Sequence, residues 1–210
     1  LSSFVAIILL GIILVVFFQS FESFSRYGLK FLVTSEWNPV KDEYGAFTAI
    51  YGTLVTSFLS LLITIPLGVG TAIFITEDFV PKVAREIIGS FVELLAAIPS
   101  VVLGLWAIFV MEPFFRAFFV FLHNFFGWIP LFSTEPTGRN SLLAILILVV
   151  MLLPIVTSIA RDSLNQVPKK LRNAAYGIGA SRWKTIFSVI LPAALSGIMA
   201  GVLLALGRAM

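Results

Sequence analysis

Long apolar runs, separated by shorter polar segments, restrict the possible fold of this chain more than any other feature. The first 18 residues carry no charge, and further apolar runs extend over about 46–76, 87–111, 141–160 and 186–207. A helix of about 20 residues crosses the ~30 Å hydrocarbon core of a bilayer, and no run shows the alternation typical of a membrane-spanning β-strand. The sequence therefore predicts an all-α membrane protein, a polytopic bundle of about five transmembrane helices.

Both ends of the chain lie in apolar sequence. The chain starts at Leu1 and stops at Met210, so it is interpreted as a fragment that is truncated at both ends. The first run is interpreted as a span rather than a signal peptide, because no basic segment precedes it and no small-residue cleavage site follows it.

The composition excludes several classes of protein. Of the 210 residues, 59% are hydrophobic and 12% are charged, against about 45–50% and 25% in soluble domains, which excludes a soluble enzyme. Cysteine is absent and His123 is the single histidine, so we expect no metal site. No Gly-rich phosphate loop followed by Lys-Ser or Lys-Thr is present, and we expect no ATPase site, no cofactor and no nucleic-acid partner for this chain.

The basic residues predict the orientation. The segment 161–184 holds six basic residues and one acid, Asp162, which makes it cytoplasmic by the positive-inside rule. Counting spans backwards places 77–86 and the N-terminus in the cytoplasm, and the segments 19–45 and 112–140 outside.

The Phe-rich stretch 113–132 allows two interpretations. Arg116, His123, Asn124 and Pro130 leave it without an uninterrupted apolar run of 18 residues. We interpret it as an interfacial or re-entrant element on the outer face; the alternative is a further crossing of the membrane.

The basic segment contains more helix signals than a simple topology anchor needs. Pro168 suits the first turn of a helix, Gly177 or Gly179 can end it, and Ser181 can cap the next helix. An apolar stripe at helical spacing lies between these signals, formed by Leu171, Ala174, Ala175 and Ile178. The sequence therefore predicts a short amphipathic helix, a Gly break and a second helix on the cytoplasmic face. The simpler alternative is a lipid-contacting anchor.

The run 173–192, N-A-A-Y-G-I-G-A-S-R-W-K-T-I-F-S-V-I-L-P, resembles the coupling motif of ABC importer permeases. That motif reads E-A-A, three residues, G, nine residues, I, one residue, L-P. The residues that match in register are Ala174, Ala175, Gly179, Leu191 and Pro192. Asn173 replaces the usual Glu and Val189 the usual Ile, so a charge-assisted contact from position 173 is not expected.

The resemblance implies an architecture and an energy source. It implies a type I importer permease in which 1–48 is an N-terminal transmembrane helix with an external segment. Residues 49–210 would be the transmembrane domain, with a cytoplasmic coupling loop at 161–184. Asn173 and the five matching residues would contact a separate cytoplasmic ATPase dimer, which would hold ATP and Mg²⁺.

Two further stretches resemble the phosphate-specific, PstC-like branch of these permeases: residues 93–106, E-L-L-A-A-I-P-S-V-V-L-G-L-W, and the terminal G-R-A-M at 207–210. This implies uptake of inorganic phosphate across a bacterial or archaeal plasma (inner) membrane. It also implies a homologous, PstA-like second permease subunit and an extracytoplasmic phosphate-binding protein. A permease for molybdate or sulfate is the first alternative, and a secondary transporter or channel is the second.

Four residues are candidates for the substrate path. Arg208 offers a permanently charged fork of donors that suits an oxyanion, although it can instead reach the membrane surface. Glu93 is an ionisable group at membrane depth and can instead form a salt bridge. Pro99 and Ser100 fit a kinked, path-lining helix, or tight helix packing. A hydroxyl stripe on the second span can face the path or a partner helix; it comprises Thr53, Thr56, Ser57 and Ser60.

Overall fold

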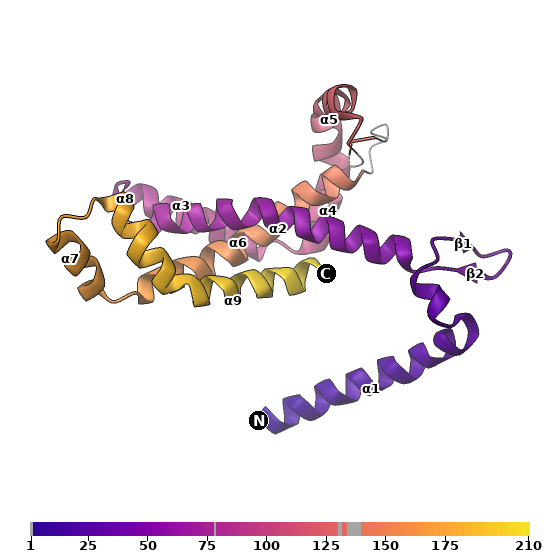
Figure 1. Cartoon of the computed structure of the whole chain (residues 1–210). Helices are drawn as coiled ribbons and strands as arrows, with labels where there is room; N and C mark the ends of the chain where they lie inside the picture. The colour runs from indigo at the N-terminus through magenta and orange to yellow at the C-terminus, as the bar shows by residue number, and fades with distance from the viewer. Residues whose placement is uncertain (1, 78, 130–131, 134–139) are drawn as a thin grey trace. The chain divides into compact units, whose positions relative to one another are not determined.

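The computed structural model describes residues 2–77, 79–129, 132–133 and 140–210, and almost all of its regular structure is helical (Figure 1). The parts of the expected outer segment at 130–131 and 134–139 lie outside the described residues.

The chain divides into two compact units, 1–53 and 54–210. The elements of the first unit are α1 (Ser2–Tyr27), a 3₁₀ turn (Leu29–Leu32), β1 (Trp37–Asn38), β2 (Glu43–Tyr44) and the start of α2 (Phe47–Thr76). The second unit holds the rest of α2, α3 (Lys82–Ala97), α4 (Ser100–Trp106), α5 (Glu112–Phe126), α6 (Ser141–Gln166), α7 (Lys169–Gly177), α8 (Arg182–Thr185) and α9 (Leu191–Ala209).

The first unit combines an apolar helix with a small hairpin. The apolar side chains of α1 from Phe4 to Phe18 are exposed in this chain, as expected of a helix whose surroundings are lipid. The helix continues to Tyr27, so the predicted end near Phe18 was too early. In the hairpin Trp37 pairs with Tyr44, and their rings meet edge to face at 5.0 Å.

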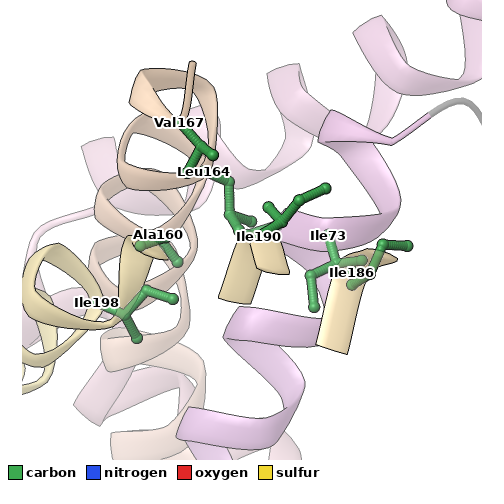
Figure 2. Packing of buried hydrophobic residues seen from close by; sticks show 9 residues of the cluster. Ile73, Ala160, Leu164, Val167, Ile186, Ile190 and Ile198 are labelled. Carbon is green, nitrogen blue, oxygen red and sulfur yellow. The ribbon is translucent and has the colours of Figure 1, made fainter. Parts of the chain in front are cut away.

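The second unit is built around α6, which packs against α9, α3 and α4. Its largest core cluster joins α2, α6 and α9 at the end of the bundle near α7, and Figure 2 shows its side chains converging from these elements. The cluster contains Ala72, Ile73, Ala160, Leu164, Val167, Ile186, Ile190, Ala194 and Ile198. Burial of this apolar surface fixes the end of α6 and the start of α9, between which α7 and α8 lie, against the end of α2.

Glycines let α9 approach α6 closely. A Cβ added at Gly201 would lie 2.9 Å from Cγ2 of Ile159, and one added at Gly197 would collide with Ser163. The two glycines are four residues apart, which is the small-residue spacing that brings membrane helices together.

The third expected span, 87–111, is not one continuous helix. α3 ends at Ala97, Ile98 is extended (φ −72°, ψ 125°), and α4 begins at Ser100. The cause is Pro99, which disfavours the helical conformation of the residue before it. The Leu95 carbonyl accepts a hydrogen bond from Ile98 N at 3.4 Å.

Composition and packing disagree about which part of this region crosses the membrane. By length and hydropathy the candidate span is Ser100–Phe126. By packing, α3 lies beside the Arg161 end of α6 through Glu93, and α4 lies beside the Leu143 end. α3 and α4 therefore both lie alongside α6, at its two ends. We follow the packing, because a segment that accompanies a spanning helix along its length lies at the same depths.

α5 continues beyond that segment and leaves the direction of α3 and α6 (Figure 1). Its inner face, Phe115 and Phe119, belongs to the cluster that includes Leu143 at the start of α6. Phe114 and Phe125 are exposed. Exposed Phe side chains suit lipid as well as an interface, and hydropathy includes α5 in a candidate span, so the interfacial interpretation of 113–132 stays a prediction.

Two π-helical turns occur in the described residues, at Ala107–Met111 and Ile186–Ile190. Each is followed by one residue and then a proline, Pro113 or Pro192. A proline inside a helix donates no hydrogen bond and its ring collides with the carbonyl four residues earlier. In the π turns the residue before the proline donates to the carbonyl five residues back, as Leu191 does to Ile186, and the helix continues without breaking.

Among the described residues, five helices are long and apolar enough to cross a membrane: Phe4–Tyr27, Phe47–Thr76, Ser100–Phe126, Ser141–Gln166 and Arg182–Ala209. The predicted all-α class with about five spanning helices is confirmed. α2 has 30 residues and is about 45 Å long, so it exceeds the bilayer core as expected.

Candidate coupling site and substrate path

α7 is the short amphipathic helix predicted after Pro168. Pro168 lies at its N-cap. Asn173 and Ala174 are exposed, whereas Ala175 is buried against the bundle. Small side chains let another backbone approach closely. The exposed side of α7 at Asn173 and Ala174 therefore leaves room for a partner protein, while the buried Ala175 holds the helix in place.

Gly179 ends the α7 region. Its φ is +81°, a left-handed conformation that costs an L-residue with a side chain about 1–2 kcal/mol. The Gly179 and Ala180 amides donate to the carbonyls of Tyr176 (2.9 Å) and Ala175 (3.0 Å), the pattern of a Schellman C-cap. Gly177 is an ordinary helical residue, so the structure selects Gly179 of the two predicted stops.

The chain returns to the membrane directly after this cap. Ser181 Oγ accepts a hydrogen bond from Lys184 N at 3.4 Å, which confirms the predicted cap. α8 then runs through the π turn at Ile186–Ile190 into α9. Leu191 packs against the largest core cluster, and Pro192 is exposed. α8, the π turn and α9 therefore form one continuous helical path, which the short link at the Gly179 cap joins to α7.

A buried ion pair fixes α7 to the end of α2. Arg172 contacts Glu77 through one guanidinium nitrogen and donates to the Leu164 carbonyl at 2.9 Å through another. The side chains of Arg172 and Glu77 are 19% and 8% exposed, so each charge depends on the other. Neither was among the predicted site residues; the available signal was the acidic pair Glu77-Asp78 directly after the second span, together with a loop that has excess basic charge.

Glu93 forms a salt bridge within the chain. Its Oε1 lies 3.6 Å from Nη1 of Arg161 on α6. The pair lines an open cleft of about 530 Å³ between the ends of α2, α3 and α6. Both signs of charge line this cleft: α3 contributes Lys82, Arg85 and Glu86, and Lys82 Nζ lies 3.8 Å from Glu86 Oε1.

The other substrate-path candidates lie apart from that cleft. Pro99 and Ser100 are exposed at the break between α3 and α4. Arg208 is exposed in the last turn of α9. The Ala209 carbonyl beside it accepts a hydrogen bond from Ser57 on α2 at 3.0 Å, which fixes the end of α9. The structure does not bring the four candidates into one pocket, because the cleft at Glu93 is lined by none of the other three.

The hydroxyl stripe of α2 serves helix packing at two positions. Ser57 contacts α9 as described, and Ser60 Oγ donates to the Ile145 carbonyl of α6 at 3.2 Å. Both side chains are buried. Of the two interpretations that the sequence left open, these serines face partner helices.

A family of known membrane proteins matches most of this chain. The family described as "Binding-protein-dependent transport system inner membrane component" matches residues 64–210. The chain belongs to this family. The matched region lies within the second unit and includes α7, its cap and the return into α9, so the predicted class of multi-pass membrane transport component is confirmed.

Individual relatives agree with the resemblance found in the sequence. The phosphate transport system permease protein PstC of Mesorhizobium japonicum is 42% identical and covers 98% of this chain, and the PstC of Pasteurella multocida is 40% identical over 99%. The chain spans 64% and 66% of these two proteins. The predicted similarity to the PstC-like branch is confirmed.

One solved structure has a similar fold. It is that of the MetNI methionine ABC transporter in inward-facing conformations, with a TM-score of 0.57, 22% identity, and coverage of 79% of this chain and 68% of that chain. At this identity the match supports the fold alone. It agrees with the predicted bundle of the ABC importer permease type.

Proposed function

We propose that this chain is the PstC-like permease subunit of an ABC importer that carries inorganic phosphate across the plasma membrane by alternating access. ATP hydrolysis takes place on a separate ATPase dimer that docks on α7, with ATP and Mg²⁺ bound there. A homologous, PstA-like permease completes the path, and an extracytoplasmic phosphate-binding protein delivers the substrate. The chain itself acts as a transport subunit rather than an enzyme.

The observation that carries this proposal is the construction of α7. It is an exposed helix with small residues on its surface, and it has two separate attachments to the membrane bundle. One is the Arg172–Glu77 ion pair to the end of α2, and the other is the short link at Gly179 to the helical path that runs through Ile186–Ile190 into α9. A displacement of α7 by closure of the ATPases would move both helices together, as in rigid-body switching.

Phosphate is proposed as the cargo from the relatives and from Arg208. The relatives that cover the chain almost completely are named phosphate transport permeases. Arg208 presents a planar guanidinium, which can donate two parallel hydrogen bonds to an oxyanion and stays charged at all physiological pH values. Its place on α9, which the chain reaches after α7 and α8, connects the cargo-binding charge to the proposed coupling element.

Stimulated ATP hydrolysis tests the proposal. The full chain would be assembled in vesicles with its ATPase, second permease and binding protein, and hydrolysis measured with phosphate, sulfate or molybdate. Stimulation by phosphate alone is expected. Stimulation by sulfate or molybdate instead would show that the cargo is wrong, and no stimulation by any of the three in an intact assembly would contradict an importer role.

Arg208 variants test the substrate path in the same assembly. Arg208→Gln should reduce phosphate-stimulated hydrolysis roughly tenfold or more, because charge-assisted hydrogen bonds are lost. Arg208→Lys keeps the charge but not the fork and should fall between wild type and Gln. If Arg208→Gln prevents assembly instead, the residue has a structural role.

A further inference from the structure

Ser57 connects α2 to the last turn of α9. Its Oγ donates a hydrogen bond to the Ala209 carbonyl at 3.0 Å, and only 1% of the residue is exposed. Arg208, the proposed phosphate-binding residue, directly precedes Ala209. Because the backbone hydrogen bonds of a helix join the residues of one turn, the bond to the Ala209 carbonyl also sets the direction in which the Arg208 side chain leaves α9.

The opposite end of α2 is joined to α7. Helical hydrogen bonding continues one residue beyond α2, since Glu77 N donates to the Ile73 carbonyl at 2.8 Å. Glu77 contacts Arg172 of α7, and both side chains are largely buried. Ser57 and Glu77 lie about 30 Å apart along the helix. One helix therefore contacts the proposed coupling element at one end and the carbonyl beside Arg208 at the other.

Between these two ends, α2 crosses α6 by close packing at Gly68. A Cβ added there would lie 2.8 Å from Cγ1 of Val156. The hydroxyls of Thr64 on α2 and Thr157 on α6 are buried, and neither has a hydrogen-bond partner within the described part of the chain. The polar contacts that connect α2 to α7 and α9 therefore lie at Glu77 and Ser57, on either side of this crossing.

We propose that Ser57 is a positioning residue for Arg208 and that α2 carries movement of α7 to it. The inference rests on the proposed function, in which the ATPases move α7 and Arg208 contacts phosphate. Closure of the ATPases then shifts Glu77 together with α7, α2 moves as one helix, and the Ser57 bond transfers the movement to the last turn of α9. This connects ATP hydrolysis to the position of the guanidinium without a direct contact between α7 and Arg208.

Variants of Ser57 in the assembled transporter test the positioning role. Ser57→Ala should lower phosphate-stimulated ATP hydrolysis roughly fivefold, because one hydrogen bond is lost, whereas Ser57→Thr keeps the hydroxyl and should stay near wild type. Thr64→Val is the matched control. It removes from the same helix a buried hydroxyl that no described residue bonds, and it should leave hydrolysis unchanged.

A double variant separates positioning from a structural role. If Ser57 acts through Arg208, addition of Ser57→Ala to Arg208→Gln should cause no further loss of hydrolysis. A further fivefold loss would show that Ser57 stabilises the bundle independently of Arg208 and would overturn the positioning role, as would a Ser57→Ala variant that behaves like wild type.

The route along α2 is tested by the pair variant Glu77→Gln/Arg172→Gln, which leaves neither partner as an unpaired buried charge. It should reduce phosphate-stimulated hydrolysis, and addition of Ser57→Ala should reduce it no further, because both changes interrupt one route. Effects at sites so far apart otherwise multiply. Asn140→Ala removes the side-chain cap of α6 and should multiply with the pair variant. The same multiplication for Ser57→Ala would show that the route does not run along α2.

A fluorophore on Gly207→Cys reports movement at the end of α9 without phosphate. Gly207 is exposed, a Cβ there would meet no described atom within 4 Å, and the chain has no native cysteine. ATP binding should change the emission in assemblies with wild-type Ser57 and with Thr64→Val, and should change it less than half as much with Ser57→Ala and with the pair variant. Equal changes in all four, or none with wild-type Ser57, would overturn the inference and leave the proposed function supported by phosphate stimulation. Absence of stimulation by any of the three anions would instead contradict the proposed function.

Discussion

Gly179 determines where α7 stops and how the chain turns back to the membrane. Its left-handed backbone allows two amides to reach the last carbonyls of the helix. An added Cβ would meet open space within the described part of the chain, so the requirement for glycine is conformational rather than steric.

This predicts opposite effects for two neighbouring substitutions. Gly179→Ala should lower the free energy of unfolding by about 1 kcal/mol, because alanine is strained at positive φ. Gly177→Ala lies in an ordinary helical position and should raise it by about 0.5–1 kcal/mol. Urea unfolding in detergent micelles measures both, and equal effects would show that Gly179 does not adopt its left-handed conformation.

Local sequence signals predicted the structural role of single residues well where the hydrogen-bond partner is near in sequence. The cap at Ser181 and a glycine stop after α7 follow from spacing alone. The Arg172–Glu77 pair joins residues 95 positions apart, and no local pattern indicates which of several basic residues meets the acid. The same limit applies to Glu93, whose partner Arg161 becomes identifiable only when α3 lies beside α6.

At the scale of elements, helices extend beyond their apolar runs. α1 reaches Tyr27 and α6 reaches Gln166, past the predicted ends at Phe18 and Ala160. Hydropathy reports where the hydrocarbon ends, whereas the backbone hydrogen bonds continue into the interface, where long polar side chains reach water. The break at Pro99 and the π turns near Pro113 and Pro192 show that a proline's effect depends on how the preceding turn can adjust.

The contact between α6 and α9 gives a prediction at this scale. Gly201→Leu would place side-chain atoms against Ile159 and should destabilise the bundle by about 1–3 kcal/mol through overpacking. Gly207→Leu, on the same helix, would enter space that the described residues leave open and should have little effect on stability. Thermal unfolding in detergent compares the two, and a similar loss in both would argue against the close α6–α9 approach.

At the scale of the whole molecule, the composition was enough to predict an all-α membrane protein. It was not enough to predict which residues form the third membrane span. Five apolar helices follow from the sequence because lipid imposes one length scale on each of them. The choice between 87–111 and Ser100–Phe126 needs the packing on α6, since both segments satisfy that length.

Cysteine labelling tests the orientation, and the chain has no native cysteine to interfere. Val40, Phe114 and Ile178 are 95%, 80% and 88% exposed. In intact cells a membrane-impermeant maleimide should label Val40→Cys and Phe114→Cys, and should reach Ile178→Cys only after permeabilisation. Labelling of Ile178→Cys from outside would reverse the orientation, and protection of Phe114→Cys on both sides would support Ser100–Phe126 as the crossing.

The π turn at Ile186–Ile190 also determines the angle, about the helix axis, between two surfaces of the chain. Each residue of an α-helix advances the helix face by about 100°. The exposed side of α7 and the Gly197–Gly201 side of α9 are related through this turn, so a one-residue deletion there would rotate one face against the other by roughly that angle while leaving the apolar pattern and the charges unchanged. The number of residues between the two surfaces therefore matters as much for the proposed coupling as the residues on the surfaces themselves.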